Sequence, residues 1–495
     1  MRTGIMWPGC DADAVWAAEE KLARHPAFGE SERIQRRAHA RYGFAVEILG
    51  ARSASVAESA RSLADGDADR MWRDPVVRKA LEDGLRCLER DETTALDDLA
   101  VVLDLARDRL ARSRGLLPTQ VEDDLVLRAG PAGRIWLPSM TGQPGPLLRR
   151  LHKAMADKFI GHNELSGQFQ PADAAAARSI HQAGELLTAV LPRLGDGVID
   201  HIAAVGLLTG AGPQGRQLSA AGGDLVPGTI VLDPCLLESV WTTAGILLHE
   251  GLHLKAFDIA RCFSLVSVPQ VMVGIPWRRA RWDVRRVLFA FHVYAHVALF
   301  QAAAAYREGE LGDRFGSPPE NAAVSRGAAG TYASAVQRAQ FLGEQLAGPL
   351  ADNLTSDGRR FAGWLLESTA PLTSWRPPSE RNAAARPAAR GSGEPGGSGP
   401  PVPRYARAAG VVVKPVPDLE VAFAYNPRDR VLSCLNLNAW AVLELCDGRT
   451  GIESDYRDLV RARLPPAEAS RQLRLALSQL TTRGLIETTE GGDPS

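Results

Sequence analysis

The pattern best suited to chemistry is the pentapeptide His249-Glu250-Gly251-Leu252-His253. Residues four apart on a helix lie on one face, so the two imidazoles could bind a single metal ion. Glu250 stands beside them, where its carboxylate could act as a general base or as a hydrogen-bond acceptor. Apolar residues on both sides predict a buried helix that shields the site from water. The alternative is that both histidines merely fill a core helix.

A second pair of histidines, His292 and His296, has the same spacing of four within another apolar stretch. Four of the ten histidines therefore form two pairs, each expected on one face of a helix. We expect the second pair to supply the third metal ligand, and the residues alone leave both of its histidines open.

Neither standard zinc-peptidase layout fits the residues that follow the pentapeptide. A downstream glutamate ligand is absent, because no acidic residue lies between Asp258 and Asp283. In the metzincin pattern a third histidine would stand where Ile259 lies. Three imidazoles with open positions suit Fe(II) as well as zinc, so the ligand type does not separate the two metals.

Several arginines lie between the two histidine pairs and could bind an anionic co-substrate. An Fe(II) oxygenase that consumes 2-oxoglutarate needs a cation for the distal carboxylate, and arginine can bind a carboxylate through two hydrogen bonds. Arg278 and Arg285 are the candidates for this role. The alternative is that these arginines are simply solvated on a loop and at a helix start.

The composition is that of a globular protein without a strongly charged partner. A chain of 495 residues is too long for one ordinary core, so we expect two or three domains. The net charge of −1 gives no bias toward nucleic acid or an anionic membrane. The sequence shows no signal-peptide pattern and no apolar run long enough to span a membrane. The six cysteines include no C-x-x-C pair, so we expect a reduced, cytoplasmic protein.

The patterning predicts a mainly α-helical chain with a small β component, an α+β arrangement around the metal motif. Four regions are expected: an N-terminal helical region (1–125), a metal-binding catalytic domain (126–375), a flexible linker (376–403) and a small C-terminal domain (404–490). The linker is rich in Pro, Gly, Ser, Ala and Arg, which cannot build a core. Within the second region, helices are expected at 148–194, 283–307 and 319–350 and around the segment LLHEGLHLKAF (247–257), and strands at 197–210 and 228–233.

Residues 404–490 predict a winged-helix domain with a β-hairpin. Strands at 421–426 and 431–437 flank the turn Pro427–Arg430, and three helices and a strand after Gly484 follow. A winged helix often binds DNA, but this region has 12 Lys and Arg against 11 Asp and Glu. A DNA-binding domain is expected to be strongly basic. The hairpin edge could instead accept a peptide as an added strand.

Two parts of the chain resemble families from pathways that modify ribosomally made peptides. The stretch LNLNAWAVLELCDGRTGIESDYRDLV, with the later LTTRGLIE, is similar to PqqD-like peptide-recognition domains. The segments LLHEGLHLKA, Pro276-Trp277-Arg278 and VYAHVALF resemble the HExxH-motif peptide-modification proteins. Members of the second family are thought to be Fe(II)- and 2-oxoglutarate-dependent β-hydroxylases of peptide side chains.

The resemblance also implies roles for particular residues. His249, His253 and His296 would hold Fe(II), with His292 as the substitute for His296. The leader of a precursor peptide would lie along the hairpin edge and the last helix. The residues of this expected peptide-binding surface are Val431, Cys434, Leu435, Leu473 and Leu477.

We therefore expect a peptide hydroxylase whose partner is a ribosomally made precursor peptide, without nucleic acid or membrane as partners. Other enzymes of the same pathway are further candidate partners. The alternative is a zinc metallopeptidase that trims a modified precursor, with Glu250 as the base that activates zinc-bound water. A non-catalytic docking protein is a third hypothesis, but it would assign no function to the four histidines.

Overall fold

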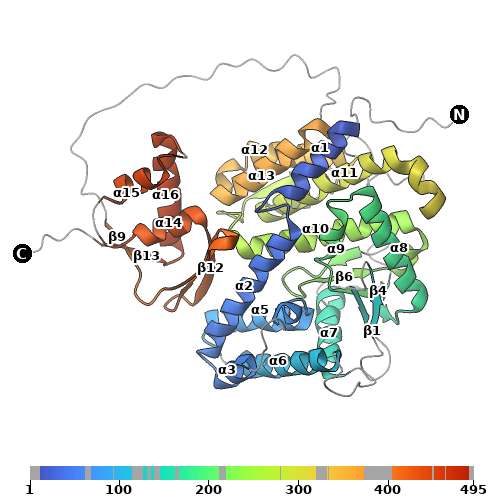
Figure 1. The fold of residues 1–495 in the computed structure, drawn as a ribbon, viewed down its shortest axis with the longest axis horizontal. Coiled ribbons are helices and arrows are strands. Elements are labelled where there is room, and N and C mark those ends of the chain that lie inside the picture. Colours follow the sequence, from blue (N-terminus) through green and yellow to red (C-terminus); the bar gives the residue numbers. More distant parts are fainter. Residues whose placement is uncertain are drawn as a thin grey trace, which may run out of the picture. The chain divides into compact units, whose positions relative to one another are not determined.

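A computed structural model describes the two parts of the chain shown in Figure 1. The described residues are 12–61, 68–92, 94–113, 126–130, 135–138, 145–161, 167–210, 219–278, 280–318, 332, 334–372, 404–448, 451–462 and 464–489. The predicted linker 376–403, and residues 319–331 of the helix predicted at 319–350, lie outside them. The chain divides into two compact units, Met1–Leu372 and Thr373–Ser495. The described residues are 65% helix and 15% strand, so helix packing builds most of the core, as predicted.

The first unit begins with helices in the described part of 1–125, where a helical region was expected. They are α1 (Ala12–Arg24), α2 (Ser31–Gly50), α3 (Ala54–Arg61), α4 (Ala68–Met71), α5 (Pro75–Glu89) and α6 (Thr94–Ser113). The start of α5 shows why such boundaries are sharp. Asp74 accepts a hydrogen bond from the Val76 backbone, and Pro75 occupies the first helical position, where no backbone donor is needed.

A small mixed sheet follows in the chain. Its strands are β1 (Val126–Ala129), β2 (Ile135–Pro138), β3 (Gln168–Gln170), β4 (Ala204–Thr209), β5 (Ser219–Ala221) and β6 (Thr229–Leu232). The order is β1-β2-β4-β6-β5, and β3 also pairs with β4. Strand β4 runs parallel to β2 and β6, whereas β3 is antiparallel to it. Every residue of β6 is buried, as expected for an apolar strand at the centre of a sheet.

Two sequence-based expectations in this region were wrong. The helix expected at 148–194 is divided into α7 (Pro146–Ala156), a π-helical turn (Asp157–Gly161) and α8 (Ala174–Val190), with β3 between them. The polar, glycine-bounded run 161–167 interrupts the apolar period there. The strand expected from Gly197 begins only at Ala204, because the preceding residues form α9 (Gly195–Ile199). A short apolar run does not distinguish a helix turn from a strand.

Two long antiparallel helices form the centre of the first unit, and both were predicted. Helix α10 (Val240–Cys262) begins at Ser239, whose hydroxyl accepts a hydrogen bond from the Thr242 backbone. Helix α11 (Val284–Phe315) begins at Asp283, which caps the Arg286 backbone in the same way. The stretch Val284–Arg307 is long and apolar enough to cross a membrane, but 83% of it is buried within the protein, as in a core helix.

Other elements complete this central region. The hairpin of β7 (Met272–Ile275) and β8 (Ala280–Asp283), which was not predicted, connects α10 to α11. Helices α12 (Ala335–Ala347) and α13 (Ser356–Thr369) pack against α11. Short 3₁₀ turns stand at Pro234–Glu238, Ala351–Asn353 and Ala370–Leu372. Together these elements surround most faces of α10 and α11.

The second unit contains the predicted hairpin and the predicted helices. Its strands are β9 (Arg404–Arg407), β10 (Val412–Val416), β11 (Val421–Asn426), β12 (Val431–Asn436) and β13 (Ile486–Thr489). Its helices are α14 (Leu437–Leu445), α15 (Ile452–Val460) and α16 (Pro466–Thr482), with a 3₁₀ turn at Pro417–Leu419. Strand β10 extends the hairpin to the three-stranded order β10-β11-β12, and β9 pairs with β13. Neither β9 nor β10 was predicted. Gly484 has a φ of 63° where α16 ends, as expected for a glycine stop.

A buried ion network attaches α10 to the N-terminal helices. Asp258 of α10 pairs with Arg78 of α5 and lies 2.7 Å from the Nδ1 atom of His201. Arg261 donates to Glu82 of α5 at 3.1 Å, and Arg41 of α2 donates to the same carboxylate at 2.6 Å. Removing one partner of such a network leaves a buried charge uncompensated. The network therefore fixes α10 against α2 and α5.

We predict that Glu82→Gln destabilises the protein by about 3 kcal/mol at neutral pH, as expected when a buried ion pair loses one partner. Burial raises the pKa of Glu82, but the guanidinium groups of Arg41 and Arg261 outweigh it and lower the pKa from 4.5 to about 2. Between about pH 2 and pH 4.5, the native state thus keeps this carboxylate ionised, whereas the unfolded chain takes up a proton. The contribution is present above pH 4.5 and disappears as the pH falls toward 2.

Urea unfolding of the wild type and of Glu82→Gln, at pH 7 and at pH 3, measures this effect. The difference in unfolding free energy should shrink at the lower pH. A difference that is the same at both pH values would show that the ionised carboxylate does not stabilise the fold.

Candidate functional site

The first histidine pair lies on the part of α10 that its neighbours leave partly open. The partly exposed positions Gly245, His249, His253 and Phe257 follow one another at helical spacing, with buried residues between them. The ring centroids of His249 and His253 are 5.1 Å apart, with an interplanar angle of 69°. The two imidazoles thus lie side by side, as the spacing predicted. We call this row of four residues the histidine stripe.

Electrostatics keep His253 in the form that binds metals. Burial, assisted by the positive charge of Arg286, lowers the pKa of His253 to about 4. The ring is therefore neutral at pH 7, and a neutral imidazole has a lone pair available for a metal ion.

Glu250 and Gly251 contact the elements packed beside α10. The Glu250 side chain is buried, and its carboxylate accepts a hydrogen bond of 2.9 Å from the Ser219 hydroxyl of β5. A Cβ atom on Gly251 would lie 2.7 Å from the Cγ1 atom of Val198 in α9. The motif therefore needs glycine at this position so that α9 can approach α10. The pentapeptide presents histidines on one side and packs against the sheet and α9 on the other.

The second histidine pair faces a different neighbour. His292 and His296 are completely buried, with ring centroids 4.5 Å apart. Both rings lie within 6.1 Å of the Trp364 ring of α13, measured between centroids. Burial lowers the pKa of both rings, that of His296 to about 3. These histidines are neutral and surrounded by aromatic residues.

Tyr294 is the residue of α11 that approaches the histidine stripe, with its ring centroid 6.3 Å from that of His249. His292 and His296 are two residues before and after it, so helical geometry turns both away from that side. Within the described part of the chain, no three His, Cys, Asp or Glu side chains are arranged so that they could hold a metal ion. The two histidines of the stripe fit two metal ligands, whereas this geometry does not support the third ligand expected from the second pair.

The two arginines proposed for co-substrate binding lie at the surface. Arg278 is exposed in the turn between β7 and β8. Arg285 forms an ion pair of 2.9 Å with Asp224, and its guanidinium lies 5.3 Å from the ring centroid of Phe257. Arg285 is therefore near one end of the histidine stripe, but a carboxylate of the protein already binds it.

A buried arginine that the sequence did not single out lies closer to the stripe. Arg338 of α12 is 2% exposed, and its Nη1 atom donates to the Tyr294 hydroxyl at 3.1 Å. Its guanidinium carbon is 5.4 Å from the ring centroid of Trp277 and 5.3 Å from that of Tyr294. The spacing of residues in the sequence could not reveal this arginine. Arg338 lies far along the chain from the pentapeptide, in an alanine-rich stretch. Tyr294 is thus in contact with both His249 and Arg338.

The residues predicted to bind a peptide divide into two groups in the second unit. Leu435 and Leu473 belong to the hydrophobic core of this unit. Val431 and Cys434 are partly exposed on β12, an edge strand of its three-stranded sheet. Leu477 belongs to the same core, with 8% of its surface exposed, and also lines a pocket. Val431, Cys434 and Leu477 are therefore the ones that a ligand could contact.

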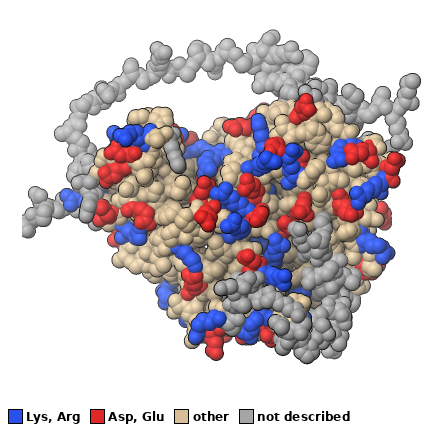
Figure 2. Space-filling model, in the orientation of Figure 1, with Lys and Arg blue, Asp and Glu red and all other residues tan. Residues whose placement is uncertain are grey.

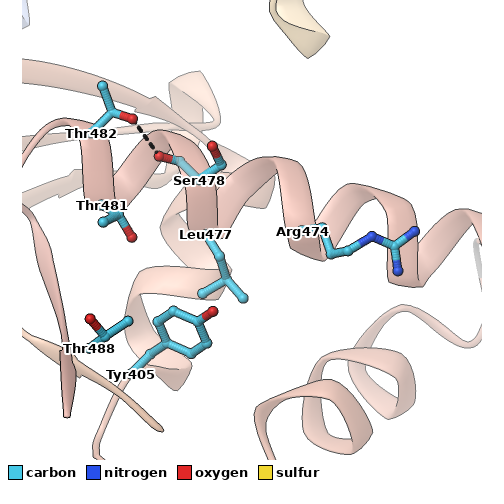
Figure 3. A pocket seen from close by; sticks show the side chains of 7 residues that line it. All are labelled: Tyr405, Arg474, Leu477, Ser478, Thr481, Thr482 and Thr488. Atoms are coloured by element: carbon cyan, nitrogen blue, oxygen red, sulfur yellow. Dashed lines mark hydrogen bonds between the residues drawn. The ribbon is translucent and has the colours of Figure 1, made fainter. Parts of the chain in front are cut away.

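The pocket has a volume of about 390 Å³ and lies between α16 and the β9–β13 pair (Figure 3). Leu477 and Tyr405 point toward one another across it. Hydroxyl groups and one arginine make up most of the remaining lining, which consists of Arg474, Ser478, Thr481, Thr482 and Thr488. Acidic and basic side chains are interspersed on the face of the molecule shown in Figure 2. This mixed surface matches the near-zero net charge.

Comparison with known proteins does not assign the chain to a family. No protein-family model matches it, and no curated protein matches it. The family resemblance therefore remains a prediction that rests on the motifs and on the site geometry.

We predict that His249→Ala and His253→Ala each lower the affinity for Co(II), a spectroscopic substitute for Fe(II), by more than about 100-fold. Changes to residues that only orient ligands already cost about 10- to 100-fold. His296→Phe, which keeps an aromatic ring against Trp364, should bind Co(II) as the wild type does. Titration followed by visible absorption measures the affinity. A large loss of affinity in His296→Phe, with the fold intact by circular dichroism, would restore His296 as a ligand.

Proposed function

We propose that this protein is an Fe(II)- and 2-oxoglutarate-dependent hydroxylase of a ribosomally made precursor peptide. The observation that carries the proposal is the histidine stripe, in which two neighbouring imidazoles lie on an accessible helix face. When bound there, Fe(II) would couple conversion of 2-oxoglutarate and O2 into succinate and CO2 to insertion of one oxygen atom into a Cβ–H bond. The remaining ligand positions belong to the co-substrate and to groups outside the histidine stripe.

The protein's own residues would bind and orient the reactants. His249 and His253 would supply two imidazole nitrogen ligands. Tyr294 of α11, in edge-to-face contact with His249, limits the orientations that this imidazole can adopt. Aromatic rings around the stripe, among them Phe257 and Phe289 at 5.2 Å between centroids, would restrict water. These residues make a site that is open on one side and apolar around the ligands.

The position of Glu250 favours a hydroxylase over a zinc peptidase. In a peptidase this carboxylate must reach a metal-bound water and take its proton. Here it is 4% exposed and accepts a hydrogen bond from the Ser219 hydroxyl of β5. Glu250 is therefore held as a structural acceptor that fixes α10 to the sheet.

The second unit would act as a winged-helix, PqqD-like domain that recognises the leader of the precursor. The three-stranded sheet ends at β12, which can accept a peptide as an added strand. Leu477 and the pocket beside it offer an apolar contact with a polar rim. A leader bound to a tethered domain presents the rest of the peptide to the first unit at roughly millimolar effective concentration.

The decisive experiment is anaerobic loading with Fe(II), followed by addition of 2-oxoglutarate, air and a precursor peptide from a neighbouring gene. Mass spectrometry should show a gain of one oxygen atom that requires 2-oxoglutarate. His249→Ala should abolish the gain, whereas His181→Ala, a half-exposed histidine of α8, should leave it unchanged. Peptide cleavage supported by zinc alone would replace the proposal with the peptidase.

Leader recognition can be tested on the two edges of the three-stranded sheet. Cys434→Arg places a bulky charge on β12 and should weaken leader binding at least tenfold, because an added strand cannot approach it. Val412→Arg changes the opposite edge, where the side chain is already 52% exposed, and should have no effect. Fluorescence polarisation of a labelled leader with the full chain measures both. An equal loss of leader affinity in the two variants would show that β12 is not the docking edge.

A further inference from the structure

Arg338 is a buried cation whose counter-ion is missing from the described part of the chain. Its side chain is 2% exposed, and it donates to two neutral oxygens, the Tyr294 hydroxyl and the Tyr332 carbonyl, at 3.1 and 3.0 Å. No Asp or Glu among the described residues forms an ion pair with it. A buried guanidinium without an anion is unfavourable unless a further group neutralises it.

Two hydrogen-bond donors beside each other also lack acceptors. The Nη2 atom of Arg338 and the Nε1 atom of Trp277 are both inaccessible to solvent and have no hydrogen-bond partner among the described residues. The guanidinium carbon lies 5.4 Å from the Trp277 ring centroid, so the two donors belong to neighbouring side chains. A site that offers only donors and a positive charge is complementary to a group with several acceptor atoms and a negative charge.

Aromatic rings from three parts of the chain surround this guanidinium. Trp277 comes from the β7–β8 turn, Tyr294 from α11 and Phe341 from α12, and Tyr332 stands shortly before α12. The Trp277 ring centroid is 6.2 Å from that of Tyr294 and 5.5 Å from that of Phe341. Trp277, Tyr332 and Phe341 are partly exposed, so solvent reaches the rim of the site. We call these four rings and Arg338 the arginine cage.

The cage adjoins the histidine stripe. Tyr294 contacts the cage through its hydroxyl and contacts His249 through the edge of its ring, with a centroid distance of 6.3 Å. A molecule held by Arg338 is therefore separated from the stripe by one side chain.

We propose that the arginine cage binds a carboxylate, with the free Nη2 of Arg338 and Nε1 of Trp277 as donors to its oxygens. The planar guanidinium suits a carboxylate because it offers parallel donors. The carboxylate comes either from a small organic acid or from an acidic side chain of a peptide. The proposal stands on the cage itself, so it can hold even if the hydroxylase reaction does not.

The test measures binding to the full chain without metal, so that neither iron nor turnover affects the result. The probes are 2-oxoglutarate, succinate and a glutamate-containing precursor peptide, each titrated by calorimetry. We expect one class of probe to bind. Arg338→Gln should raise its Kd at least tenfold. Trp277→Phe keeps the ring but removes one donor, so it should raise the Kd several-fold.

Two control variants separate this role from a purely structural one. Arg360→Gln changes an exposed arginine of α13, and Trp282→Phe changes the tryptophan next to Trp277, with ring centroids 6.1 Å apart. Neither should alter the Kd. Trp277→Phe also keeps the test valid if Arg338→Gln fails to fold.

The outcomes distinguish the two sources of the carboxylate. Binding of 2-oxoglutarate or succinate identifies a small-acid site. Binding of the peptide alone, lost when its glutamate is changed to glutamine, identifies a peptide site. If no probe binds the wild type, or if probes bind Trp277→Phe and folded Arg338→Gln as tightly as the wild type, the proposal is wrong.

Discussion

The antiparallel packing of α10 against α11 decides which side chains can act together. Phe257 meets Phe289 near one end of the pair, and Gly245 faces Phe300 near the other. Between these contacts, the rotation of α11 about its axis brings Tyr294 to His249 and turns His292 and His296 toward α13. The histidine stripe, the aromatic rings around it and the neighbouring arginine cage all follow from this one arrangement.

The N-terminal helices have a clear physical role in this arrangement. Their buried ions, above all Arg78 and Glu82 of α5, bind Asp258 and Arg261 near the end of α10. Lys255, also on α10, is completely buried and donates to the Gly29 carbonyl between α1 and α2. These contacts fix α10 through residues outside the histidine stripe.

Much of this architecture could be predicted from the sequence, and the misses have identifiable causes. Helices α10 and α11 were evident because their long apolar segments permit few alternatives. The β11–β12 hairpin was evident from its alternating pattern and its turn. Short segments such as β3 and α9 were misread, since a few apolar residues suit either structure.

The site itself was only half predictable. Spacing within one helix fixes which residues share a face, so the pairing of His249 with His253 followed directly. The rotation of one helix relative to another is set by packing, so the orientation of His292 and His296 could not be deduced. Arg338 was hidden for a related reason, because only the fold reveals that an arginine in an alanine-rich helix is buried without a counter-ion among the described residues.

The central claim is that the histidine stripe is the metal site. The most direct measurement is a crystal structure of the metal-loaded protein, with anomalous diffraction recorded at the absorption edge of the metal. The account predicts one anomalous peak within bonding distance of both His249 and His253. A peak between His292 and His296, with none at the stripe, would contradict it.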